Sequence, residues 1–114
     1  MIIEKGEKVH VVYRRLLENE VRRHFMGEIV ESNGSIARID GFVSIFDSTT
    51  NKFTKKSEKR TTIIDLAESG YIANILPNYV IIDDLQYVLN QNKKLVLTDG
   101  KTFSLDINEF GNFR

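Results

Sequence analysis

Two segments of the chain mix basic with aromatic residues, a combination that is typical of proteins that bind single-stranded nucleic acid. The first is YRRLLENEVRRHF at residues 13–25, and the second is KFTKKSEKR at residues 52–60, where five of nine residues are basic. Lysine and arginine would contact phosphates, and aromatic rings would stack on bases. The candidate nucleic-acid-binding residues are therefore Arg14, Arg15, Arg22, Arg23, Phe53, Lys55, Lys56, Lys59 and Arg60.

The segment at residues 52–60 has a second interpretation. It would be a solvated loop whose lysines keep an exposed edge strand from pairing with another chain. The pI of about 6.7 favours this interpretation, because nucleic-acid-binding domains are usually strongly basic. RNA or single-stranded DNA binding is therefore the alternative hypothesis.

Charge is unevenly divided along the chain although the formal net charge is zero. Residues 1–60 carry 12 Lys and Arg against 9 Asp and Glu, whereas residues 61–114 carry 4 against 7. If the two halves occupy different faces, copies of the chain would attract each other head to tail. The other interpretation is that these charges interleave in space.

Two histidines, His10 and His24, are the only imidazoles. A metal site could use both with Glu28 or Glu31 as a carboxylate ligand. Such histidines are more often ordinary residues of a surface or core edge, so the sequence predicts no metal and no cofactor. The chain has no cysteine, and its sequence contains no glycine-rich phosphate loop, nucleophile elbow or H-E-x-x-H motif. We therefore expect no catalytic residue and no enzyme.

The elements that would position these residues are strands. The chain has 13 Ile, 9 Val and 11 aromatic residues but only 3 Ala, and branched and aromatic side chains favour strands. TFSLDI at residues 102–107 alternates between apolar and polar residues. It follows Asp99-Gly100, a turn dipeptide, so we predict a hairpin over residues 94–107 with a tight turn.

A second hairpin is predicted around Asn33-Gly34, which separates HFMGEIVES from SIARIDGFVSIF. Gly27 and Gly41 interrupt its two strands, and glycine inside a strand often marks a bulge or a sharp bend. The pattern therefore indicates a strongly bent sheet or a barrel.

Further β-rich runs are VHVVY, RTTIID and NYVIID, with QYVLN as another possible strand. IIDLAESGYI predicts one short helical turn that begins at Asp65. Two segments are ambiguous between strand and helix. They are residues 83–92 and residues 13–25. For residues 13–25, the neighbouring strands favour a hairpin that brings the two arginine pairs side by side.

The segment FMGEIVESNGSIARIDGFV resembles the first motif of the Sm-like (Lsm/Hfq) small β-barrel proteins, with the resemblance extending over residues 8–46. It implies an SH3-type barrel that assembles into rings through its edge strands. The turn at residues 32–35 departs from the family's loop, and no Arg-Gly or Lys-His pair follows. No RNA-pocket residue of the family is therefore carried over.

These observations predict an all-β protein. We expect a single domain over residues 1–114, folded as a small, strongly bent antiparallel barrel of SH3/Sm-like type with one short helical turn and an extra C-terminal hairpin. We expect it to be a non-catalytic binding or assembly module that self-associates through strand edges and an exposed apolar patch. A cytosolic location is expected, because the N-terminal segment is too polar for a signal peptide and no apolar run approaches the roughly 20 residues that span a bilayer.

Overall fold

The fold is all-β, as the composition predicts. The computed structural model describes residues 2–13, 22–47, 49–50, 52–68 and 70–107. The strands of this described part are β1 (Lys8–Tyr13), β2 (Arg23–Asn33), β3 (Ile36–Asp47), β4 (Lys52–Lys55), β5 (Arg60–Asp65), β6 (Tyr71–Leu76), β7 (Gln86–Leu89), β8 (Leu95–Thr98) and β9 (Ser104–Asp106). A single 3-10 turn, η1 (Ile82–Asp84), precedes β7.

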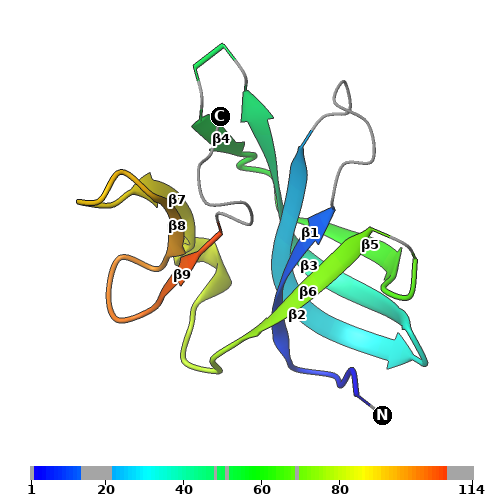
Figure 1. Ribbon diagram of the computed structural model, residues 1–114. Coiled ribbons are helices and arrows are strands. Elements are labelled where there is room, and N and C mark those ends of the chain that lie inside the picture. Colours follow the sequence, from blue (N-terminus) through cyan, green and yellow to red (C-terminus); the bar gives the residue numbers. More distant parts are fainter. Residues whose placement is uncertain (1, 14–21, 48, 51, 69, 108–114) are drawn as a thin grey trace.

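The strands form two antiparallel sheets, which lie side by side in Figure 1. The large sheet has the order β4-β3-β2-β1-β6, and β5 also pairs with β3. β4 and β5 can both pair with β3 because β3 is long. Its residues 36–41 pair with β5, and its residues 44–47 pair with β4. The small sheet has the order β7-β8-β9.

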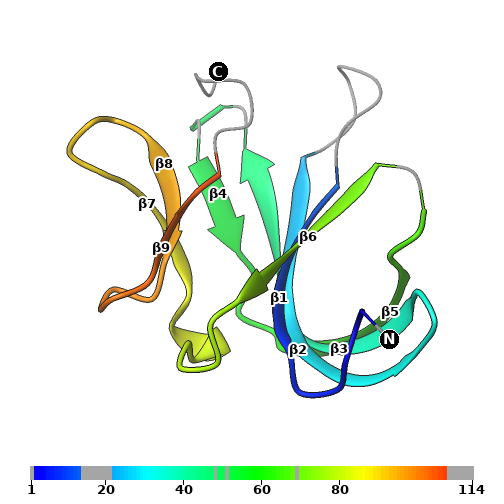
Figure 2. The same ribbon diagram turned by 60° about the horizontal axis from the view of Figure 1, so that its bottom comes forward.

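The large sheet is strongly bent (Figure 2). Side chains from its distant strands pack together on one face, which we call the inner face. Its buried residues are Val9, Val11, Phe25, Ile29, Ala37 and Ile39. Ile64 of β5 and Tyr71 of β6 pack against them. The opposite face, which we call the outer face, packs against the small sheet. There Met26, Phe42 and Leu76 share a buried cluster with Leu97 and Phe103.

Glycine is required where β2 and β3 cross the bend. Gly27 lies opposite Gly41, and a Cβ placed on Gly41 would be 1.9 Å from the carbonyl oxygen of Met26. A Cβ on Gly27 would be 2.4 Å from the carbonyl oxygen of Asp40. The register shifts between Ile29 and Glu31, which marks a bulge shortly after Gly27. The predicted association of these glycines with a bend is therefore confirmed.

Both predicted hairpins are present. β2 and β3 pair up to Asn33 and Ile36, and Gly34 has a φ of 62°. β8 pairs with β9, but the Asp99-Gly100 turn is wider than predicted, because the Asp99 carboxylate accepts hydrogen bonds from the N–H groups of Lys101 (2.8 Å) and Phe103 (3.1 Å). These bonds stabilise a loop over residues 99–103 in place of a tight turn.

The predicted helical turn at Asp65 is wrong in its details. Asp65 does begin a turn, since its carbonyl accepts from the N–H of Glu68 (3.1 Å) and its carboxylate accepts from the N–H of Ala67 (3.0 Å). These bonds close a turn between β5 and β6 without a helix. The 3-10 turn lies instead at residues 82–84, and a helix over residues 83–92 is excluded because residues 86–89 pair with β8.

A closed barrel is not found. Within the described strands, the pairings of the large sheet end at β6 on one side and at β4 and β5 on the other, so the sheet is open. β1 and β2 are paired from Tyr13 and Arg23 onward, as the hairpin interpretation expects, while the connection at residues 14–21 lies outside the described residues. Across the described ranges, no helix has the length and apolar character needed to cross a membrane.

Candidate functional site

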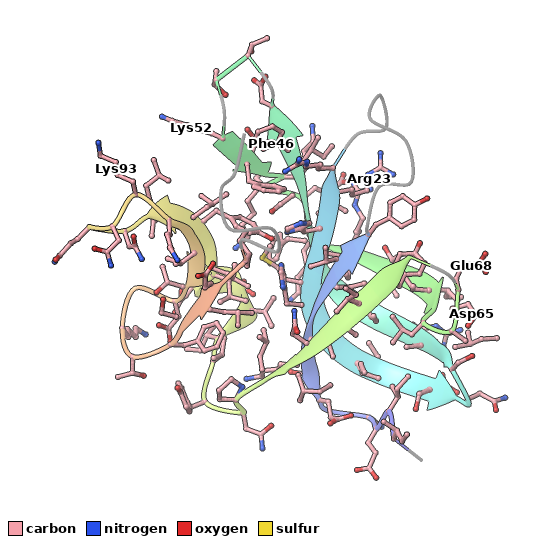
Figure 3. All side chains as sticks on the ribbon, in the orientation of Figure 1. Arg23, Phe46, Lys52, Asp65, Glu68 and Lys93 are labelled. Atoms are coloured by element: carbon pink, nitrogen blue, oxygen red, sulfur yellow. The ribbon has the colours of Figure 1, made fainter. Side chains whose placement is uncertain are left out.

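The inner face holds a pocket of about 790 Å³ near the ends of β1, β2 and β5. Its floor is apolar and includes Val11, Phe25 and Val43. Three cationic side chains also line it, and they are Arg23, Lys56 and Arg60. Figure 3 labels Arg23 at one end of the large sheet and Glu68, an acidic lining residue, at the turn after β5. The pocket therefore combines an apolar floor with a mainly cationic rim.

Strand register explains why the three cations converge. Arg23 lies at the first position of β2, opposite Tyr13 in β1 and Ile45 in β3. Arg60 lies at the first position of β5, opposite Gly41, which has no side chain to cover it. Lys56 follows β4, and its N–H donates to the carbonyl of Val43 (2.8 Å). Three separate segments thus each place one cation at the same end of the bent sheet.

Two tyrosines at this end are not among the predicted site residues, although Tyr13 belongs to the first basic and aromatic segment. Tyr13 and Tyr71 lie opposite each other in β1 and β6, line the pocket, and have ring centroids 5.4 Å apart. The alternation of VHVVY puts Tyr13 on the face of Val11, so the face that Tyr13 occupies could have been predicted from the sequence. The pairing of β1 with β6 could not have been predicted, because it joins segments about 60 residues apart that no local sequence pattern connects.

The predicted nucleic-acid-binding residues are divided by the fold. Arg23, Lys56 and Arg60 meet at the pocket, and Arg60 is also paired with Glu58 (3.0 Å). Arg14 and Arg15 lie outside the described residues. Arg22 lies over the ring of Phe46, with its guanidinium carbon 5.4 Å from the ring centroid.

The other predicted contacts have structural roles on the outer face and its edge. Lys55 Nζ donates to the carbonyl oxygens of Asp83 (3.0 Å) and Leu85 (2.7 Å), and its Nζ lies 4.4 Å from the centroid of Phe42. Lys59 pairs with Asp83 at 3.5 Å. Phe53 is buried among other rings, where it cannot stack on a base. Of the predicted residues that the structure describes, three cations therefore meet at one place.

A cluster of polar side chains is buried on the outer face, between the two sheets. His10 Nε2 lies 3.3 Å from His24 Nδ1, and both nitrogens lie 3.0 Å from the hydroxyl oxygen of Tyr87. His10 Nδ1 and Ser44 Oγ are buried without a hydrogen-bond partner. Neighbouring strands position the histidines, and β7 of the small sheet brings Tyr87 to them. The three groups form a polar triangle inside an apolar core.

Burial controls the protonation of this triangle. Desolvation lowers the pKa of His10 to about 4. Desolvation, with smaller contributions from His10 and Arg22, lowers the pKa of His24 to about 3. Burial raises the pKa of Tyr87, and the nearby hydroxyl of Ser44 only partly offsets this rise although it makes no hydrogen bond of ordinary geometry. At neutral pH both imidazoles are therefore uncharged and the phenol keeps its proton.

The two histidines thus lie together, as a metal site would require. Glu28 and Glu31, the carboxylates that could have completed such a site, do not join them. Glu28 is exposed, and Glu31 is exposed and paired with Arg38 at 2.7 Å. Over the residues that the structure describes, no group of three or more His, Cys, Asp or Glu gathers around one point. Tyr87, which the sequence did not single out, takes the third position instead.

Comparisons with protein-family models, with curated proteins and with solved structures found no match for this chain.

The lowered pKa values predict that the protein loses stability in mild acid. The unfolded chain binds protons on both histidines below pH 6.5, while the folded protein resists them down to about pH 4 for His10 and pH 3 for His24. The contribution of the two histidines to the free energy of unfolding is therefore fully present above pH 6.5 and is lost as the pH is lowered. Each histidine contributes up to about 1.4 kcal/mol per pH unit to the slope of the free energy of unfolding against pH.

Denaturant unfolding at several values between pH 7.5 and pH 4.5 measures this slope. The variant His24→Gln removes one of the two groups, so its free energy of unfolding should fall about half as steeply with pH as that of the wild type. A variant with the same slope as the wild type would contradict the assignment. Glu28→Gln, a change at an exposed site in the same strand, is the matched control and should leave the slope unchanged.

Proposed function

We propose that this chain is a non-catalytic binding module whose inner pocket holds a ligand with one anionic group and an apolar body. The observation that carries this proposal is the convergence of Arg23, Lys56 and Arg60 above an apolar floor. A volume of about 790 Å³ lies within the range of roughly 300 to 1,000 Å³ that is usual for small-molecule sites.

The chemistry of the rim supports a carboxylate or a similar anion. A guanidinium group binds carboxylates through two parallel hydrogen bonds, and a second and third cation raise the local positive potential. The floor of Val11, Phe25 and Val43 would accept the hydrocarbon part of the ligand, with a gain of about 25 cal/mol for each Å² of apolar surface removed from water. Glu68 adds a negative charge at the rim, which disfavours a second anionic group.

Decanoate and decanol are the matched probes, because they differ only in the charged head group. We expect decanoate to bind more tightly than decanol by about tenfold and Arg23→Gln to weaken decanoate binding by a similar factor, since each change removes one charge-assisted contact. Isothermal titration calorimetry measures both. The control is Arg38→Gln, which changes an exposed arginine that is paired with Glu31 and absent from the pocket. Equal affinity for the two probes would contradict the proposal.

Single-stranded nucleic acid is the second candidate ligand. The observation that favours it is the position of Tyr13 and Tyr71 in the same pocket as Arg23, since tyrosine rings can stack on bases beside a phosphate contact. The buried position of Phe53 counts against the extended surface that the sequence suggested.

A fluorescence titration with an oligothymidylate at two salt concentrations tests this candidate. If the pocket binds nucleic acid, the affinity should fall as salt is raised, and Arg22→Glu combined with Arg23→Glu should abolish measurable binding. An affinity that responds neither to salt nor to these substitutions would rule it out. In that case decanoate binding would still test the first proposal separately.

Self-association through strand edges is the assembly part of the proposed function. β5 and β6 are both edge strands, and they carry the exposed apolar side chains Ile63 (63% exposed) and Ile75 (55% exposed). Edges of this kind can pair with a second copy unless a charge or a proline interrupts them. An SH3/Sm-like assembly through edge strands would use the same surfaces, and a cytosolic location remains part of this proposal.

Light scattering over a range of concentrations tests the self-association. We expect a mass above the 13.1 kDa of one chain and a shift toward that mass in Ile75→Lys, because a lysine on an edge strand disfavours pairing. The matched control is Ile2→Lys, which changes an isoleucine that is 95% exposed and lies before the first strand. A wild-type protein that stays monomeric at every concentration would contradict self-association.

A further inference from the structure

We propose that the buried triangle of His10, His24 and Tyr87 binds a divalent transition-metal ion of the Zn²⁺ class, with His10 Nε2, His24 Nδ1 and Tyr87 Oη as ligands. The proposal concerns the outer face of the large sheet, and of its three ligands only His24 is also among the residues that line the inner pocket.

The spacing of the three atoms fits a tetrahedral ion. Zinc lies about 2.0 to 2.1 Å from histidine nitrogen and from oxygen ligands, so two ligands of a tetrahedral site are about 3.3 Å apart. The distance between His10 Nε2 and His24 Nδ1 is 3.3 Å, and both distances to Tyr87 Oη are 3.0 Å. An ion above this triangle needs the hydroxyl to move by only a few tenths of an ångström.

The ligand types also fit. Zinc binds the neutral form of imidazole, and both rings are buried beside the phenol. Tyr87 would bind as phenolate and release its proton to solvent when the ion enters, because the charge of a bound metal offsets the effect of burial on the hydroxyl. The balanced step is the binding of one M²⁺ ion with the release of one H⁺ from Tyr87. The core is then left with one net positive charge instead of two.

Hydrogen bonding can satisfy the three atoms of the triangle but not every polar atom around them. The hydroxyl of Tyr87 can donate to one imidazole nitrogen and accept from the N–H of the other. Two further atoms in the same region, His10 Nδ1 and Ser44 Oγ, are buried with no hydrogen-bond partner. A buried polar group without a partner costs about 1 to 3 kcal/mol, and of these two atoms an ion bound to His10 Nε2 would provide a partner for Ser44 Oγ.

Ser44 supplies the second observation that points to an ion. It is fully buried and lies directly opposite His24 in the pairing of β2 with β3, so its side chain is on the same face as the histidine. We assign Ser44 Oγ as the fourth ligand, or as the group that holds a water molecule in the fourth position of the ion.

The surroundings of the triangle match those of a structural metal site. The ring of Phe53 stacks on Tyr87 with centroids 4.8 Å apart and lies 4.4 Å from the ring of His24, so the ligands are held in an apolar shell. Tyr87 also lines a surface pocket of about 540 Å³ together with Asp83 and Gln86, so one of the three proposed ligands borders a pocket at the surface. Since the ligands come from both sheets, a bound ion would link them.

Titration of the chelator-treated protein with Co²⁺ tests the site, because four-coordinate Co²⁺ has intense visible absorption bands and substitutes for Zn²⁺. We expect these bands with one ion per chain, their loss when Zn²⁺ is added, and the release of one proton per ion. Zn²⁺ should also raise the midpoint of thermal unfolding, and a chelator should reverse the rise. Absence of the bands at a tenfold excess of Co²⁺ would overturn the proposal.

Tyr87→Phe removes only the hydroxyl and retains the ring that stacks on Phe53. It should weaken Zn²⁺ binding by about 100-fold or more, whereas the control Tyr79→Phe, at an exposed tyrosine, should not change it. Unchanged binding by Tyr87→Phe would overturn the assignment of the ligands.

If Tyr87→Phe does not fold, the wild-type protein provides a second measurement. Long-range ¹⁵N NMR spectra of the imidazoles identify the nitrogens that Zn²⁺ contacts. We expect large changes at His10 Nε2 and His24 Nδ1. Changes at the other ring nitrogens, or at neither histidine, would overturn the proposal.

Discussion

The close approach of β2 and β3 at Gly27 and Gly41 is the constraint on which the rest of the structure depends. A Cβ on Gly41 would lie 1.9 Å from the carbonyl oxygen of Met26, which is backbone and cannot move aside cheaply. The absence of both side chains lets the two longest strands bend together. The bend makes one face of the large sheet concave enough to pack β5 near β6, and it leaves the other face to pack against the small sheet.

Strand alternation then places the two candidate sites back to back on the same strands. In β2, Arg23 and Phe25 point to the inner pocket, whereas His24 and Met26 point to the outer core. In β1, Tyr13 is on the inner face and His10 on the outer. A shift in register by one residue would exchange every one of these side chains between the faces. The pairing that begins with Tyr13 and Arg23 is therefore as important to both sites as the side chains themselves.

The sequence predicted both hairpins and most of the strands because these depend on local patterns, but NYVIID at residues 78–83 contains a turn and the start of η1 instead of a strand, and β6 was not predicted. Alternation identified β9, and the dipeptide Asn33-Gly34 identified the turn between β2 and β3. It could not predict the sharing of β3 by β4 and β5, or the contact of Tyr87 with His10 and His24, because both depend on packing between distant segments. The same limit applies to KFTKKSEKR. Alternation within β4 sends Phe53 and Lys55 to the outer face, whereas Lys56, which follows β4, lines both the inner pocket and the pocket beside Phe53.

The energetics of the outer core argue that its polar triangle is more than a structural contact. A buried polar network stabilises a fold when every member is satisfied, and otherwise an apolar core of the same shape is at least as stable. Here the neighbouring rings of Phe53 and Phe46 show that the sequence can fill this space with apolar groups. His10 is fully buried with one nitrogen unpartnered, and it contributes to the lowered pKa of the neighbouring His24. Two buried imidazole nitrogens 3.3 Å apart, each 3.0 Å from a phenol oxygen, have the spacing that a tetrahedral ion requires, and this spacing is why an ion is proposed here.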